Sequence, residues 1–323
     1  MKSILFASTA LVAFAGAAAA QGVTLTGNAE MGIFGNDDID TQFFTDVDVT
    51  FTMAGSTDNG LTFGATVDLD EGGAGAPAVA DNSDDGGATI FISGAFGTLT
   101  MGDTDGALDW ALTEVAFNSG SLADDETEHA GYNGNSGLDG TGDGQILRYD
   151  YTFDSFGIAL SAEQVPGTGE DAGDDEVLGI GFKTDLDLGG NAIAFGIGYQ
   201  NGDDVDAYGL SASGSFAGFN AGISYLRTEV DTGAGDFDSD HFGIGVGYTT
   251  GAISVSANYG FYDTDAGDTS GIGLSAGYDL GGGAIVQLGY GYSDFDGDID
   301  VGDALDDEAD DFSTFSLGVR MNF

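Results

Sequence analysis

Hydrophobic and polar residues alternate along most of this chain with a period of two. The last stretch shows the pattern clearly: one face carries Phe315, Leu317, Val319, Met321 and Phe323. The opposite face carries Thr314, Ser316, Gly318, Arg320 and Asn322. Alternation over about ten residues predicts a β-strand with lipid on one side and water on the other.

The same pattern returns at regular intervals and predicts sixteen strands. These are residues 23–34, 43–54, 61–70, 88–93, 98–102, 145–153, 156–164, 176–186, 192–201, 205–216, 219–229, 241–250, 252–262, 270–280, 284–295 and 312–323. An even number of antiparallel strands, with a first and a last strand able to pair, closes a barrel without a free edge. The prediction is a 16-stranded antiparallel transmembrane β-barrel.

The connections between these strands alternate in length. Short turns such as 94–97, 154–155, 217–218 and 281–283 alternate with longer acidic loops such as 71–87 and 296–311. Short turns at one end and long loops at the other are typical of outer-membrane barrels. A soluble sandwich would turn its apolar faces inward and would not require sixteen consecutive hairpins. A calcium-binding solenoid would repeat a G-G-x-G-x-D nonapeptide in register, and no such repeat is present.

Composition adds the compartment and excludes several classes of function. Residues 1–20 combine Lys2, an apolar stretch and a small-residue end, Ala18-Ala19-Ala20, which predicts a cleaved secretory signal peptide. The remaining chain, 21–323, keeps four basic residues against 55 acids, a formal charge of 4 − 55 = −51. Such a charge repels phosphates, so we expect no nucleic-acid partner. No cysteine is present, and therefore no disulfide or thiolate metal site is expected.

One long segment, residues 103–143, interrupts the strand pattern. A segment of this length without alternation inside a compact domain usually has a function. It carries no Lys or Arg, and its acids are Asp103, Asp105, Asp109, Glu114, Asp124, Asp125, Glu126, Glu128, Asp139 and Asp143.

Three stretches of the first hundred residues carry a family resemblance: LTGNAEMG at 25–32, FTMAGSTDNGLTFGA at 51–65 and SGAFGTLTMGD at 93–103. With the strand count and the final Asn-Phe, the sequence resembles the alphaproteobacterial, Rhodobacter-type general porins of the outer membrane. The resemblance implies a homotrimer of sixteen-stranded barrels, each with its third long loop, here 103–143, folded into the lumen as a constriction. It also implies that the barrel closes where Gln21 meets Phe323.

The residues that face the lumen by parity depart from the family pattern of a basic wall opposite an acidic loop. The basic candidates for the pore wall are Arg148, Lys183 and Arg320, whereas the second and third strands present Asp46, Asp48, Asp68 and Asp70. Arg227 shares parity with Tyr225 and is expected at the outer rim. Carboxylates lining a channel enrich cations, so the sequence predicts a passive pore for small hydrophilic solutes that prefers cations.

Other chemistry is less well supported by the sequence. The stretch with Asp294, Asp296, Asp298 and Asp300 resembles an aspartate-rich calcium loop without the glutamate twelve positions on that an EF-hand requires. Ca²⁺ held by acidic loops, bridging to lipopolysaccharide, is therefore a hypothesis. The two histidines, His129 and His241, are far apart in sequence, and no nucleophile–base arrangement is visible, so we expect no enzyme. A substrate-specific channel, or a plugged surface or adhesion barrel, remains the alternative function.

Overall fold

The computed structural model describes residues 22–37, 39–72, 87–117, 120, 122, 127–140, 145–164, 176–189, 191–231, 233, 235–297 and 311–323. The predicted signal segment, 1–20, lies outside these residues. Among the described residues no helix is long and apolar enough to cross a membrane.

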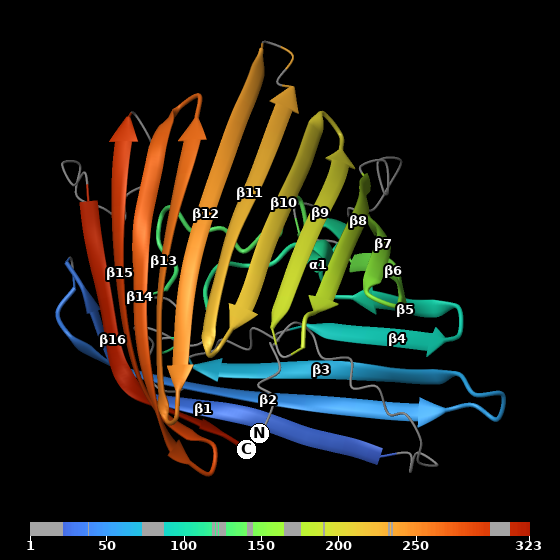
Figure 1. Cartoon of the computed structure of the whole chain (residues 1–323), viewed down its shortest axis with the longest axis horizontal. Helices are drawn as coiled ribbons and strands as arrows, with labels where there is room; N and C mark the ends of the chain where they lie inside the picture. The colour runs from blue at the N-terminus through green and yellow to red at the C-terminus, as the bar shows by residue number, and fades with distance from the viewer. Residues whose placement is uncertain are drawn as a thin grey trace.

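The described residues form sixteen strands and one short helix (Figure 1). The elements are β1 (Gly22–Asn36), β2 (Gln42–Ser56), β3 (Thr62–Gly72), β4 (Ala88–Gly94), β5 (Gly97–Gly102), α1 (Ala107–Ala111), β6 (Gln145–Phe153), β7 (Phe156–Gln164), β8 (Glu176–Asp187), β9 (Ala192–Gly202), β10 (Val205–Phe216), β11 (Phe219–Asp231), β12 (Asp236–Thr250), β13 (Ile253–Thr264), β14 (Gly267–Gly281), β15 (Ala284–Gly297) and β16 (Asp311–Asn322). The predicted number of strands is confirmed, and the ends differ by a few residues.

The strands form one closed antiparallel barrel in which each strand pairs with its neighbour in sequence and β1 pairs with β16. The closing ladder runs from Asn28 opposite Asn322 to Asn36 opposite Thr314. The backbone N–H of Phe323 donates to the carbonyl of Gly27 at 2.9 Å. The chain end therefore extends the closing ladder. Gln21, predicted to meet it there, lies outside the described part of the chain.

Apolar side chains lie on the outside of the barrel, and the inside is polar or filled by chain. Exposed residues of the outer face include Phe43, Ile90, Ile197, Ile244 and Leu274. The buried set is instead rich in polar side chains from the inner face, among them Gln200, Ser211, Asn258 and Ser316. This inversion of a soluble protein is what a barrel surrounded by lipid requires.

The turns at one end of the barrel are tight. Ala217 and Gly218 both have positive φ, 52° and 88°, which is the geometry of a two-residue hairpin whose twist matches that of the strands. At the opposite end, β11 and β12 extend to the pair Asp231–Asp236. The predicted loop 230–240 is therefore much shorter than expected, because ion pairs and hydrogen bonds hold both strand ends in the sheet.

Candidate constriction loop and lumen wall

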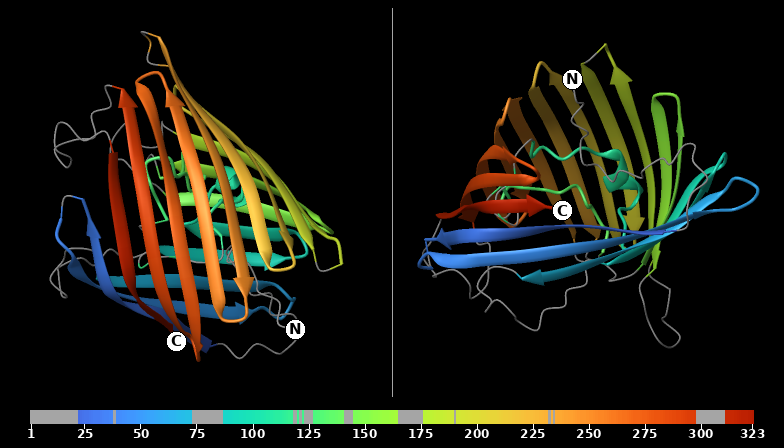
Figure 2. Two further views of the ribbon diagram at one scale, coloured as in Figure 1. Left: turned by 60° about the vertical axis from the view of Figure 1, so that its left-hand side comes forward. Right: turned by 90° about the horizontal axis from the view of Figure 1, so that it is seen from below.

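The described parts of the segment between β5 and β6 lie inside the barrel, where Figure 2 shows them in teal and green. Its helix α1 contacts β7, β8 and β9. Leu108 of the helix and Leu138 at the far end of the segment pack with Val177, Ala207 and Leu226 of the inner wall. The apolar core thus sits between loop and wall, on one side of the lumen.

Glycines on the inner face let the loop backbone approach the wall. A Cβ atom added at Gly181 would lie 1.9 Å from the carbonyl oxygen of Ala107, and one at Gly196 would lie 2.0 Å from that of Ala111. At Gly245 the distance to the carbonyl oxygen of Val115 would be 1.6 Å. No side chain fits at such distances. These glycines therefore allow direct contact between the loop backbone and the wall.

Polar side chains of the wall bind the loop backbone strand after strand. Ser161 of β7 accepts from the N–H of Ala107 at 2.9 Å, and Ser211 of β10 accepts from that of Thr113 at 2.9 Å. The same role is filled by Gln200 for Leu138, Glu163 for Gly140, Ser293 for Ala130 and Ser316 for Leu122. Because buried backbone groups must be hydrogen-bonded, these side chains replace the water that a free loop would have.

The two basic residues on β6 and β8 lie against the beginning of the loop. The Arg148 guanidinium donates to the carbonyl of Asp105 at 2.5 Å and lies 3.7 Å from its carboxylate. The Lys183 ammonium donates to the carbonyl of Trp110 at 2.8 Å and sits 3.8 Å from the centre of its ring. Arg148 is only 5% exposed. Both charges are therefore engaged by the loop.

Several acids of the loop, Asp105, Glu114 and Asp139, lie near Asp109 of α1. The carboxylate of Asp139 accepts from the N–H of Gly106 at 2.6 Å and from the Gln200 amide at 2.5 Å, which joins the two ends of the loop. Burial raises the pKa of Asp139 to about 6 despite these bonds. Burial, reinforced by the charges of Asp105, Asp139 and Glu114, raises the pKa of Asp109 to about 8. Asp109 is thus mostly protonated at neutral pH.

The structure describes only some of the other predicted loop acids. Asp103 and Glu114 are exposed, and Glu114 accepts from the Tyr132 hydroxyl at 2.8 Å. Asp124, Asp125 and Glu126 lie outside the described residues, as does Asp143.

The predicted acids of the pore wall lie on the inner face of β2 and β3. Asp46, Asp48 and Asp68 are half-buried. Asp48 accepts from the Asn28 amide at 2.6 Å, and Asp68 accepts from the Thr50 hydroxyl at 2.8 Å. Asp70 is the Cα partner of Asp48 in the sheet, but its side chain is not described.

Arg320, the third predicted basic wall residue, pairs with an acid across the closing seam. Its guanidinium lies 3.5 Å from the carboxylate of Glu30, which is 4% exposed.

The weak metal candidates fall at the end of β15. Asp294 and Asp296 belong to the strand, and Asp298 and Asp300 lie outside the described residues. The described part of the chain contains no group of three or more His, Cys, Asp or Glu side chains placed to hold a metal ion. The calcium hypothesis stays a prediction.

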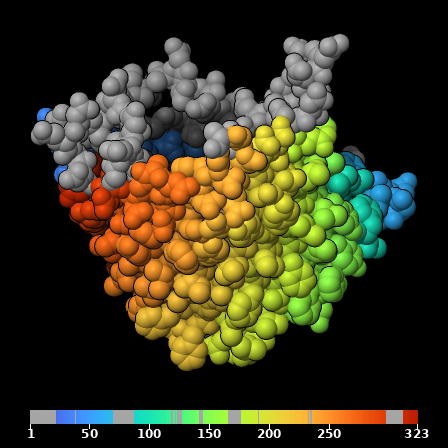
Figure 3. All heavy atoms as spheres, turned by 90° about the horizontal axis from the view of Figure 1, so that it is seen from above, coloured from blue at the N-terminus to red at the C-terminus, as the bar shows by residue number. Residues whose placement is uncertain are grey.

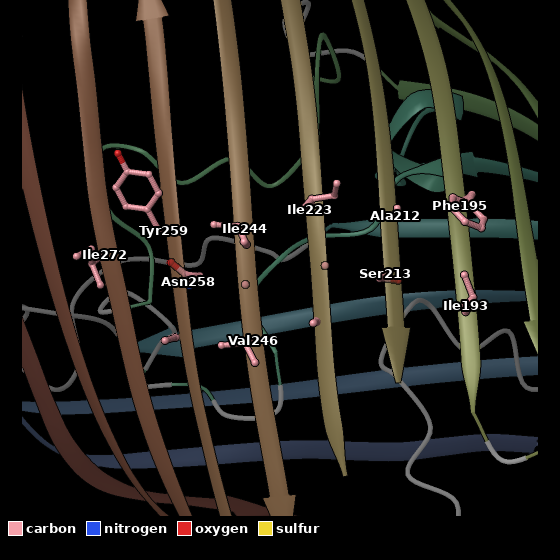
Figure 4. Close-up of a pocket in the computed structure, with 14 residues that line it drawn as sticks. Ile193, Phe195, Ala212, Ser213, Ile223, Ile244, Val246, Asn258, Tyr259 and Ile272 are labelled. Atoms are coloured by element: carbon pink, nitrogen blue, oxygen red, sulfur yellow. The ribbon is translucent and has the colours of Figure 1, made fainter. Parts of the chain in front are cut away.

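The outward face of the barrel carries two features of its own. Arg227 lies there and forms ion pairs with Glu229, Asp238 and Asp240, at the rim where parity placed it. A hollow on the same face is lined by side chains of β9–β14, including Ile193, Phe195, Ile223 and Val246 (Figure 4). Its apolar lining and outward position separate it from the lumen.

Sequence reasoning missed the residues that anchor the loop. Alternation places these serine, glutamine and asparagine side chains on the inner face but does not indicate what they bind. One signal was available in the sequence: inward-facing glycines are frequent on β7–β14. The loop backbone lies against the wall at several of them, such as Gly181, Gly196 and Gly245.

Comparison with known proteins gives a consistent result. The family described as Gram-negative porin matches residues 7–298. A porin of Rhodobacter capsulatus is 31% identical over 330 residues, covering 93% of this chain and all of that protein. A porin structure refined at 1.8 Å resolution superposes with a TM-score of 0.70 at 26% identity, covering 94% of this chain and all of that one. A triple mutant of Rhodopseudomonas blastica porin superposes with a TM-score of 0.65 at 20% identity, with the same coverage.

Proposed function

Because the chain belongs to the Gram-negative porin family, we propose that it is a diffusion channel of the outer membrane that passes small hydrophilic solutes passively and prefers cations. Family membership and the closed barrel account for the membrane location and the pore. The preference for cations rests on how charge is distributed around the inner wall.

One observation carries the preference: the loop is fastened to one arc of the wall, and acids line the arc beside it. The contacts described above run from Arg148 on β6 round to Ser316 on β16, and Leu122 also reaches Gly32 of β1. The arc of β2 and β3 presents Asp46, Asp48 and Asp68. Blue atoms of the N-terminal strands are visible in the depth of the opening in Figure 3. We infer that solutes pass along this acidic arc.

The basic side chains do not offset these acids. Arg148 and Lys183 are held under the loop by backbone carbonyls, and Arg320 faces the carboxylate of Glu30. A solute in the lumen therefore meets carboxylates with few counter-charges, which raises the local concentration of cations. The preference should weaken with added salt, because the Debye length falls from about 10 Å at 0.1 M to about 3 Å at 1 M.

The test is the reversal potential of the protein in a planar bilayer under a salt gradient. We expect a value on the cation side that moves toward zero in the double variant Asp48→Asn, Asp68→Asn. One charge at about 7 Å in water contributes about 0.6 kcal/mol, which changes the local concentration of each monovalent ion about two- to threefold per carboxylate, in opposite directions for cations and anions. Asp206→Asn removes the same charge from the outward face, where the Tyr199 hydroxyl contacts it, and serves as the control. Anion selectivity of the unmodified protein would refute the proposal, and absence of conductance would favour a plugged surface barrel.

We also propose that three copies assemble side by side through the short strands of the wall, β4 and β5. Strands β4 and β5 have only seven and six residues, fewer than the nine to eleven that a tilted strand needs to cross a bilayer. Their outward residues Ile90, Ile92, Leu99 and Met101 are apolar and exposed. A wall too short to span the lipid but apolar outside is best covered by protein.

A further inference from the structure

The chain contains two histidines, and both contact the backbone of one residue of the loop, Gly131. The Nδ1 atom of His129 accepts a hydrogen bond from the N–H of Gly131 at 3.1 Å. The Nε2 atom of His241, on β12, lies 2.9 Å from the carbonyl oxygen of Gly131. We call His129, Gly131, His241 and Asn258 the Gly131 clamp.

The hydrogen bonds of the clamp determine where the protons are. A carbonyl oxygen can only accept, so Nε2 of His241 must carry a proton and donate it. Nδ1 of His129 accepts, so its proton is on Nε2, which lies 2.6 Å from the Oδ1 atom of Asn258. Asn258 in turn donates to the carbonyl of Thr127 at 3.0 Å. His129 is therefore neutral in this arrangement, and His241 is neutral as long as its Nδ1 binds no second proton.

The clamp has little space to relax. Gly131 lies so close to β13 that an added Cβ would be 2.1 Å from the carbonyl oxygen of Gly260. An added Cβ at Gly271 of β14 would lie 2.4 Å from Nδ1 of His129. His241 is 1% exposed, and its ring lies tilted against that of Tyr262 with 4.6 Å between ring centroids. Small movements of the loop would therefore break several contacts at once.

Adding a proton to either ring opposes this geometry. Protonation of His129 at Nδ1 would place its new N–H against the N–H of Gly131, so that two donors face each other. Protonation of His241 would put a charge on a buried ring whose Nδ1 has no hydrogen-bond partner among the described residues. A buried charge without a partner is strongly unfavourable.

The titratable groups around the rings do not compensate for such a charge. Tyr132 on the loop and Tyr259 and Tyr262 on β13 face the rings, and Glu114 is bound by the Tyr132 hydroxyl at 2.8 Å. Glu128 precedes His129 in the sequence. Burial lowers the pKa of His129 below its usual 6.5. The docked loop thus binds fewer protons than the undocked loop, so the contribution of this ring to docking is complete above pH 6.5 and is lost as pH falls below it.

We propose that His129 and His241 are positioning residues that hold the second half of the constriction loop against β12–β14 while neutral and release it when protonated. The release widens or destabilises the constriction under acid conditions. The conductance arm of the test rests on the proposed pore function, whereas the positioning role is measured independently of permeation.

The experiment compares the full-length protein with the double variant His129→Gln, His241→Gln, whose side-chain amides can donate hydrogen bonds but do not titrate in this range. Hydrogen exchange of the segment 127–134, corrected for the intrinsic effect of pH, should accelerate at least tenfold between pH 7.5 and pH 5 in the unmodified protein. The variant should show little change. In bilayers, current fluctuations should rise over the same range only when the histidines are present.

Two outcomes would overturn the proposal. The first is exchange of the segment that responds to pH equally in both proteins. The second is loss of the acid response in Asp139→Asn while the histidine variant retains it, which would assign the effect to the carboxylate at the other end of the loop. If no channel conducts at all, the exchange measurement still decides the role of the clamp.

Discussion

Replacing Gly245 by alanine should detach the constriction loop while leaving the barrel intact. Gly245 lies on the inner face of β12, and its added Cβ would be 1.6 Å from the carbonyl oxygen of Val115 and 2.7 Å from the carbonyl carbon. Ordinary contacts begin near 3.4 Å. Because both obstructing atoms belong to the backbone, no side-chain rotation can relieve the overlap. The loop must withdraw from the wall at this point.

The size of the effect follows from the contacts that the withdrawal breaks. Val115 is 3% exposed, and exposing a buried valine costs about 1.5–2 kcal/mol. The hydrogen bond from Thr113 to Ser211, 2.9 Å long, is two residues away and is worth about 1 kcal/mol. Together these losses amount to about 3 kcal/mol, which lowers the ratio of docked to undocked loop roughly a hundredfold.

The assay is the size limit for solutes entering liposomes that contain the protein, together with bilayer current noise. Gly245→Ala should admit larger sugars and show noisier currents, with unchanged thermal stability of the barrel. The control is Gly222→Ala on the neighbouring strand, because Gly222 is the partner of Gly245 in the sheet. Its added Cβ would meet the ring of Phe117 at 2.8 Å, a side chain that can turn. Equal size limits in Gly245→Ala, Gly222→Ala and the unmodified protein would refute the argument.

Two further predictions concern charge and assembly. Because the pKa of Asp109 is raised to about 8, its carboxyl is neutral at pH 6 and ionised above pH 9. Asp109→Asn should therefore leave the cation-to-anion permeability ratio unchanged at pH 6 and lower it above pH 9. A large change already at pH 6 would contradict this assignment. The variant Ile90→Lys changes a residue that is 64% exposed on the short strand β4, and it should convert trimers to monomers on native gels. The control Ile244→Lys, on the 15-residue strand β12, should preserve the trimer. Dissociation by both variants or by neither would argue against the proposed interface.

The fold was predictable from the sequence because lipid and water impose a strict period-two pattern on every strand. The segments around Arg148 and Tyr208 were placed to the residue. The beginnings of β12 and β14 were predicted several residues too late, because their first residues are mainly Asp, Ser, Thr and Gly, with Phe237 as the single apolar side chain among them. Alternation gives no signal there. Contacts between neighbouring strands, such as the ion pair of Arg227 with Asp240, keep β12 in the sheet, and only the folded barrel reveals such partners.

The arrangement of the loop was less accessible. The alternation correctly places Lys183 on the inner face, but it cannot show that the Lys183 ammonium donates to the carbonyl of Trp110. The same holds for Gln200, which is fully buried between Leu138 and Asp139. A strand pattern reports which face a residue occupies. The identity of what lies opposite depends on how a segment without periodicity folds.

The distribution of loop anchors determines which changes can alter the constriction. A single neutral hydrogen bond, such as that from Ala107 to Ser161, contributes about 1 kcal/mol, and its neighbours can hold the loop when it is lost. Serine-to-alanine changes along the wall should therefore have small effects. Larger effects require a site where one event breaks several contacts together. Gly245, where the two backbones touch, is one such site, and Gly131, whose N–H and carbonyl are each bound by a histidine, is another. Of these two sites, we expect only the one at Gly131 to respond to pH, which the surroundings of a cell can change.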